Sequence, residues 1–320
     1  MMVKYLIRRV ILMIAILLLV SMIIFALVNI LPGDPARLML GQEASPQALA
    51  ALREEMGLND PLYMQYIHWL INILHGDFGY SLRDHTPVLD VLLQKIPVTL
   101  ELTVFSFIIA LLIAIPVGIL SATRRGKFSD YVSTFLALSG ISLPSFWLGI
   151  LLIYFFAVKL NWFPPSGYVP LSQNIGQSLL LMVLPAVSLG TRLSAELMRL
   201  LRSSLLEVLQ ADYIRTGYAK GLLERSVVIG HALKNALIPV VTVGGMQLAT
   251  FFGGAVITET IFGIPGVGQL VVNAILTRDF PVVQGAVLFM AFMVVVINLI
   301  VDIVYSLIDP RIKLGEVSKG

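Results

Sequence analysis

Long stretches without charge constrain this chain more than any other feature. No charged side chain occurs between Val10 and Leu31, and the stretch follows Lys4, Arg8 and Arg9. The hydrocarbon core of a bilayer is about 30 Å thick, so about 20 apolar residues in a helix can cross it. The chain is 58% hydrophobic and 13% charged, with a mean hydropathy of +0.90. Because these values exclude a soluble globular domain and a disordered chain, the sequence predicts a polytopic membrane protein.

Six stretches of this kind predict six transmembrane helices in one all-α domain covering residues 1–320. The predicted spans are 10–31, 98–120, 132–158, 178–197, 237–261 and 282–308. The first is too long for the apolar part of a signal peptide, and no small-residue cleavage site follows it, so we expect it to be retained. Two longer connections remain, an outer loop at 32–97 and a cytoplasmic loop at 199–235.

The distribution of basic residues predicts the orientation. With the amino terminus inside, sixteen of the 22 Lys and Arg residues lie in cytoplasmic segments, Arg192 among them, and five lie outside. Because cytoplasmic loops of membrane proteins are enriched in Lys and Arg, both termini are predicted to be cytoplasmic.

Several predicted spans contain residues that are unusual within membranes. Pro116, Pro144, Pro185 and the pairs Gly244-Gly245 and Gly253-Gly254 favour kinks and close helix packing, with a gating or pathway role as the alternative. Three acids also lie within the spans, at Glu101, Glu259 and Asp302. Such groups are functional candidates, although helix packing or pairing with another subunit is the favoured interpretation.

The outer loop contains a predicted amphipathic helix. A turn at Asn59-Asp60-Pro61 precedes apolar residues at helical spacing from Leu62 to Leu74. The helix is either a structural anchor at the membrane surface or a docking surface for an external partner. His68 and His75 are seven residues apart in this helix and just after it. No carboxylate has matching spacing, so no metal site is predicted.

The cytoplasmic loop contains a second predicted helix. Asp212 is a suitable N-cap for a short helix through Lys220, and Gly221 can end it in a left-handed conformation. The predicted fourth span continues beyond the membrane before it, and an amphipathic stretch from Val227 to Leu233 follows it. A short capped helix on this side suits a protein on whose spans a cytoplasmic partner must act.

The chain lacks the motifs of an enzyme. It has no cysteine, no HExxH and no GxSxG, and no lysine is followed by serine or threonine as in a phosphate-binding loop. We therefore predict no catalytic residue, no metal site and no cofactor in this chain.

Several motifs together resemble one family. In the cytoplasmic loop and the following span these are Ala211-Asp212-Tyr213-Ile214-Arg215-Thr216-Gly217-Tyr218-Ala219-Lys220-Gly221-Leu222, the segment His231 to Pro239, the segment Phe252 to Gly268 and the segment Arg278 to Gly285. In the outer loop they are Leu31-Pro32-Gly33-Asp34-Pro35 and Gly76-Asp77-Phe78-Gly79, and Asp309-Pro310-Arg311 follows the last span. Nearly the whole chain thus resembles the B-type permease of the dipeptide/oligopeptide/nickel family of ABC importers.

The resemblance implies the type I ABC importer permease fold and a set of partners. These are a second homologous permease forming a heterodimer, two ATPase subunits that bind ATP and Mg, an extracytoplasmic solute-binding protein and the lipid bilayer, with no nucleic acid. It also implies site residues. The coupling helix and loop would comprise Asp212, Tyr213, Ile214, Arg215, Thr216, Ala219, Lys220, Gly221 and Leu222, and Asp34, Asp77, Phe78 and Gly79 would serve binding-protein docking or an outer gate. One departure is Gly217, where the family's Glu-Ala-Ala pattern has alanine.

The expected function follows from the resemblance. The chain would import di- or oligopeptides, or a related solute such as glutathione or a nickel chelate, by alternating access driven by the separate ATPases. It would lie in a bacterial or archaeal inner membrane. The alternative is a self-sufficient secondary transporter or channel, in which the three intramembrane acids would couple ions.

Overall fold

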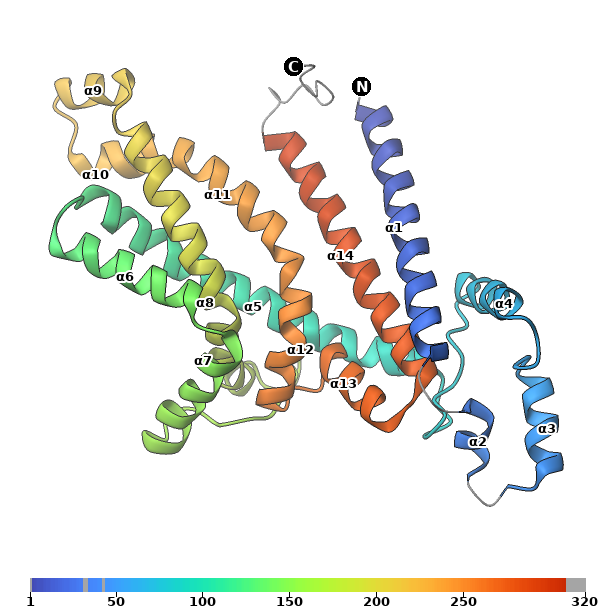
Figure 1. The fold of residues 1–320 in the computed structure, drawn as a ribbon. Coiled ribbons are helices and arrows are strands. Elements are labelled where there is room, and N and C mark those ends of the chain that lie inside the picture. The colour runs from blue at the N-terminus through green and yellow to red at the C-terminus, as the bar shows by residue number, and fades with distance from the viewer. Residues whose placement is uncertain (1, 31–33, 42–43, 309–320) are drawn as a thin grey trace. The chain divides into compact units, whose positions relative to one another are not determined.

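A computed structural model describes residues 2–30, 34–41 and 44–308 as a set of helices (Figure 1). Leu31, predicted to end the first span, and the motif at 309–311 lie outside these residues. No strand occurs in the described ranges, which hold only an isolated bridge between Tyr80 and Pro87. The described residues divide into two compact units, those within 2–99 and 265–296 in the first and those within 100–264 and 297–308 in the second.

The first unit contains a small apolar core that joins several of its helices. Its helices are α1 (Met2–Ile30), α2 (Pro35–Leu40), α3 (Pro46–Glu55), α4 (Leu62–Leu74), the first part of α5 (Val88–Thr123), α13 (Val267–Thr277) and most of α14 (Phe280–Ile308). The core joins Val88 and Leu92 of α5 to Val267 of α13 and Ala286 of α14. Segments far apart in the sequence are thereby held together.

The amphipathic helix predicted in the outer loop is confirmed as α4. It packs against α1 through an aromatic cluster in which the ring centroid of Phe25 lies 5.5 Å from that of Tyr66 and 5.7 Å from that of Trp69. The hydroxyls of Ser21 and Tyr66 lie 2.9 Å apart. This contact fixes α4 along one face of the first span.

The second unit is organised around α8 (Ile175–Val208). Its other elements are the rest of α5, α6 (Phe128–Ser142), α7 (Ser145–Leu152), η1 (Ile153–Lys159), α9 (Asp212–Ala219), α10 (Glu224–Ser226), η2 (Val227–Ala232), α11 (Leu233–Leu248), α12 (Thr250–Phe262) and the end of α14. Helices α6, α7, α11 and α12 all contact α8. Leu189, Leu193, Leu197, Leu201 and Leu205 recur every four residues along α8 and are buried. This repeat places one continuous apolar face of α8 in the core.

An ion pair ties α6 to α8 in this unit. The buried Asp130 carboxylate accepts hydrogen bonds from Arg202 Nε at 2.8 Å and Arg202 Nη2 at 3.0 Å. The Ser121 hydroxyl and the Gly126 amide donate to the same carboxylate. Four donors therefore compensate the cost of burying this charge.

The observed helices differ from the predicted spans at several bends. Five helices are long and apolar enough to cross a membrane, or up to seven if two bent pairs each count as one span, so six lies within this range. The stretch predicted as the third span is bent by 109° where Leu143 and Pro144 separate α6 from α7. Pro144 disfavours helical geometry at Leu143, which is extended. A second break in the helical stretch follows α12, where Gly263 is left-handed and Pro265 follows.

Two predicted boundaries also move. Helix α5 begins at Val88, ten residues before the predicted second span, and continues through Pro97. Burial of Val88 and Leu92 in the core offsets the cost of a proline within a helix. Helix α8 extends from Ile175 to Val208, so Arg192, assigned to the cytoplasmic side in the sequence analysis, lies near the middle of a candidate span.

Close helix packing through glycine is confirmed at some positions and absent at others. A Cβ at Gly245 would lie 2.9 Å from Val301 Cγ1, and one at Gly254 would lie 2.9 Å from Leu189 Cδ1. A Cβ at Gly253 would meet nothing within 4 Å. The closest approach is at Gly190 of α8, where a Cβ would lie 2.6 Å from the backbone oxygen of Ser106 in α5.

Gly190→Ala is expected to destabilise the protein, because the added methyl group meets backbone that cannot move independently of its helix. Overpacking of this kind costs about 1–3 kcal/mol. Thermal unfolding of the purified chain in detergent should show a clear fall in Tm. Gly253→Ala is the matched control and should leave Tm nearly unchanged, and equal Tm values for the two variants would contradict the packing described here.

Candidate functional site

Helix α9 is the short helix predicted in the cytoplasmic loop, and the structure confirms it with one correction. It forms a separate short arm after the end of α8 (Figure 1). The predicted N-cap, Asp212, is instead the first helical residue, and Ala211 occupies the cap position without a side-chain hydrogen bond. The Ala211 carbonyl accepts from the amide of Ile214 at 3.0 Å. Asp212 still contributes a negative charge to the first turn, where its interaction with the helix dipole is favourable.

The end of α9 has the predicted glycine geometry. Gly221 has φ of +79°, and its amide donates to the Tyr218 carbonyl at 2.9 Å. The Leu222 amide donates to the Gly217 carbonyl at 3.3 Å, which completes the hydrogen-bond pattern of a Schellman motif. This geometry turns the chain sharply from α9 toward α10.

A single apolar residue anchors α9 to the unit. Ile214 is 1% exposed, and α9 packs against η2, whose Val227 and Val228 are buried. The side-chain amide of Asn235 in α11 donates a hydrogen bond from Nδ2 to the Tyr213 hydroxyl at 2.8 Å, which connects α9 to α11. One face of α9 is therefore attached to the helix that continues into α11.

The opposite face of α9 is open. The exposed residues of the predicted coupling set are Asp212, Tyr213, Arg215, Thr216, Ala219, Lys220, Gly221 and Leu222. Arg215 and Asp212 form only an exposed ion pair with 3.6 Å between Nη1 and Oδ1. A helix anchored on one side and open on the other can transmit a displacement of its outer face to α11.

The residues predicted for docking or an outer gate have well-defined structural contacts. Asp34 caps α2 and pairs with Arg53 of α3, with 2.5 Å between Oδ2 and Nη2. The Asp77 carboxylate accepts from the Gly79 amide at 2.9 Å. Phe78 packs against the core of the first unit, and Gly79, with φ of +77°, accepts from the Val88 amide at 2.9 Å. These contacts shape the loop, and the docking role remains a prediction.

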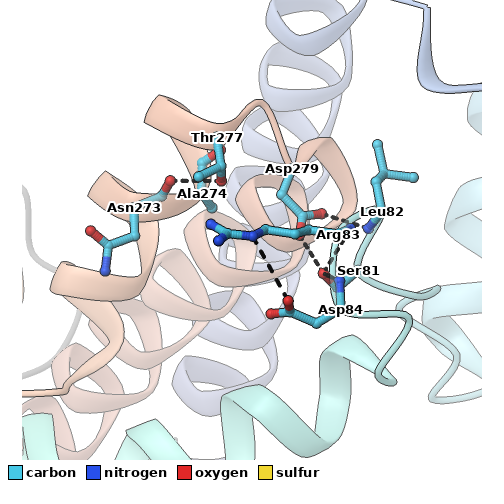
Figure 2. Close-up of polar contacts among 8 residues, drawn as sticks. All are labelled: Ser81, Leu82, Arg83, Asp84, Asn273, Ala274, Thr277 and Asp279. Atoms are coloured by element: carbon cyan, nitrogen blue, oxygen red, sulfur yellow. Dashed lines mark hydrogen bonds and ion pairs between the residues drawn. The ribbon is translucent and has the colours of Figure 1, made fainter. Parts of the chain in front are cut away.

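The loop after Gly79 joins the segment before α14 through a buried carboxylate that the sequence analysis did not single out. Figure 2 shows Asp279 facing Ser81 and Leu82. Its carboxylate accepts from the Ser81 hydroxyl at 2.5 Å and from the Leu82 amide at 3.1 Å. Asp279 is 6% exposed and Ser81 2% exposed. The motifs at 76–79 and 278–285, almost 200 residues apart, therefore belong to one local structure.

The backbone around Asp279 explains its position. Arg278 is left-handed with φ of +59°, and the Asp279 amide donates to the Ala274 carbonyl at 2.9 Å, which ends α13. The reversal lets the Asp279 side chain reach the outer loop instead of continuing along α13. The proximity of motifs in three dimensions cannot be read from their separation in the chain.

The predicted intramembrane acid Glu101 contacts a tyrosine of the second unit. The Tyr168 hydroxyl donates to the Glu101 carboxylate at 2.9 Å. Burial, together with this hydrogen bond, raises the pKa of Tyr168 to about 12, so the phenol stays protonated at neutral pH. Glu101 thus fastens the loop containing Tyr168 to α5. Within the described ranges, no group of three His, Cys, Asp or Glu residues could hold a metal ion.

These features define a polytopic α-helical membrane protein with attached surface helices. Residues 114–314 match the family model described as binding-protein-dependent transport system inner membrane component, and residues 2–103 match the corresponding N-terminal family. The chain belongs to this family of inner membrane transport components, and a self-sufficient carrier or channel is not favoured.

Similar proteins extend over nearly the whole chain. A probable peptide ABC transporter permease of Sinorhizobium fredii is 42% identical over 97% of this chain and 99% of its own length. The dipeptide transport system permease DppB of Escherichia coli K12 is 41% identical over 98% and 99%. Among solved structures, a chain of the MetNI methionine ABC transporter in an inward-facing conformation has a TM-score of 0.55 and 20% identity, covering 68% of this chain and 96% of its own. This likeness supports the type I importer permease fold.

Asp279→Ala is expected to loosen the outer loop, because it leaves the buried Ser81 hydroxyl and Leu82 amide without their acceptor. An unsatisfied buried group costs about 1–3 kcal/mol. Hydrogen exchange should show the amides of Ser81 and Val88 opening about 10- to 100-fold more often. The control is Asp84→Ala, which removes an exposed carboxylate 3.9 Å from Arg83 Nε. Equal exchange in both variants would show that Asp279 does not hold the loop.

Proposed function

We propose that this chain is the B-type permease subunit of an ABC importer for di- or oligopeptides. The observation that carries the substrate assignment is the similarity to peptide and dipeptide permeases over 97–98% of the chain. Glutathione and nickel chelates are related solutes within the same proposal. The protein pairs with a second homologous permease, two ATPase subunits and an extracytoplasmic binding protein, in a bacterial or archaeal inner membrane.

The energy of transport comes from outside this chain. ATP and Mg bind to the ATPase subunits, whose closure displaces α9 and its counterpart in the second permease. Since α9 packs against η2, and η2 is continuous with α11, displacement of α9 rotates a span and opens the path alternately to each side. The orientation that permits this has both termini and α9 in the cytoplasm, as the excess of basic residues predicts.

Purification of the tagged chain from its native host tests the proposed assembly. A second permease and ATPase subunits should co-purify in mild detergent and be identified by mass spectrometry. The complex is then reconstituted into lipid vesicles together with the binding protein. Uptake of a radiolabelled dipeptide should require ATP on the side of the membrane where the ATPase subunits lie. Recovery of the chain alone, with transport that does not need ATP, would overturn the proposal.

Gly221→Pro tests the coupling role of α9. Proline cannot adopt φ of +79° and lacks the amide that donates to Tyr218, so the turn after α9 should be lost. We expect peptide uptake to fall at least tenfold while membrane insertion is retained.

Gly217→Ala is the matched control in the same helix. Its Cβ would lie 3.6 Å from Val227 Cγ2 and 3.8 Å from Leu222 Cδ1, both ordinary contacts. Alanine also favours the helix by up to about 1 kcal/mol, and the departure from the family pattern at this position is therefore expected to be neutral for uptake. Normal uptake by Gly221→Pro would count against α9 as the coupling element.

A further inference from the structure

The open face of α8 carries charge where a lipid-facing helix would be apolar. From residue 181 to the end of α8 the exposed residues are Arg192, Arg199, Ser203 and Glu207, with the partly buried Glu196 between the first two. Their spacing of three or four residues places all five on one face. Charged groups within a candidate span face a bundle interior or a water-filled space, because lipid cannot solvate them. This face of α8 is therefore not expected to contact lipid, and borders a helix bundle or a water-filled space.

A polar cavity opens on the same face. It has a volume of about 350 Å³, and its lining includes Arg192 and Glu196 of α8 and Gln247 of α11. All of these residues belong to the second unit. The volume falls at the small end of the range of ligand pockets, which suits a small solute.

Opposite charges meet at this cavity. The Glu196 carboxylate accepts from Arg192 Nε, 3.3 Å from Oε1, and from Gln247 Nε2, 2.8 Å from Oε2. The Arg192 side chain is 72% exposed, and its two terminal nitrogens have no hydrogen-bond partner among the described residues. A guanidinium offers five N–H donors in a fork that matches a carboxylate. Glu196 has further lone pairs, since a carboxylate can accept about four hydrogen bonds.

We infer that this cavity binds the two charged ends of a zwitterionic peptide, the peptide carboxylate at Arg192 and its ammonium group at Glu196. The inference rests on the proposed function and assigns its substrate contact within this chain. Gln247 is a positioning residue, because its amide holds the Glu196 carboxylate. Because only the two termini of the peptide are recognised, its side chains are not selected, and peptides of many sequences can bind.

The test uses the complete importer in proteoliposomes with saturating binding protein. Arg192→Gln and Glu196→Gln should each reduce dipeptide uptake at least tenfold, while co-purification of the complex stays normal. The control is Arg199→Gln, which removes a charge from the same face outside the cavity and should retain uptake within about twofold. Arg192→Lys keeps the charge and loses the fork, and it should reduce uptake several-fold. If the Arg192→Gln variant does not assemble into the complex, the Arg192→Lys variant provides the test.

A charge swap separates peptide binding from a structural ion pair. Arg192→Glu combined with Glu196→Arg restores opposite charges on α8 but exchanges their places. The swap should transport as poorly as the single variants if the sites recognise peptide ends. Wild-type uptake in the swap variant, or single variants that transport like Arg199→Gln, would overturn the inference. Failure of the wild-type importer to take up any peptide would instead remove the proposed function.

Discussion

The packing of α8 is the interaction on which the second unit depends. Within lipid, association between helices relies on close contact and hydrogen bonds, because burying apolar side chains from lipid yields little. Gly190 allows α8 to approach the α5 backbone, and the repeated leucines fill the space toward the neighbouring helices. The Asp130–Arg202 pair adds a specific polar contact to α6. With one face packed, α8 leaves a neighbouring face of charged residues exposed.

The same unit connects this face to the proposed coupling helix. Gln247, which donates to Glu196, lies near the end of α11, and α11 is continuous at its start with η2, against which α9 packs. A displacement of α9 therefore has a continuous helical route to a group at the polar cavity. Such a route suits the proposed function, in which the packing of the helices changes in response to partners.

In the first unit, the main role of the tertiary contacts is to hold the long outer loop in a defined structure. The buried Asp279 carboxylate and the core around Val88 connect the outer loop with α13 and α14. Asp77 and Gly79 shape the turn between α4 and α5, and their side chains and backbone are engaged within it. A docking role for this region would accordingly depend on the surface that the turn presents.

The sequence by itself determined the class of protein, its apolar spans and the two amphipathic helices α4 and α9, because these depend on local composition and periodicity. The left-handed conformation of Gly221 could also be predicted, since the position after a short helix is often left-handed and glycine is favoured there. The sequence indicated kinks at prolines such as Pro144, but only the tertiary structure decided which prolines break a helix, since Pro144 does and Pro97 does not. It also decided the partners of Asp279 and the environment of Arg192 and Glu196. The physical reason is that burial and side-chain pairing join residues distant in sequence, and these contacts override local preferences.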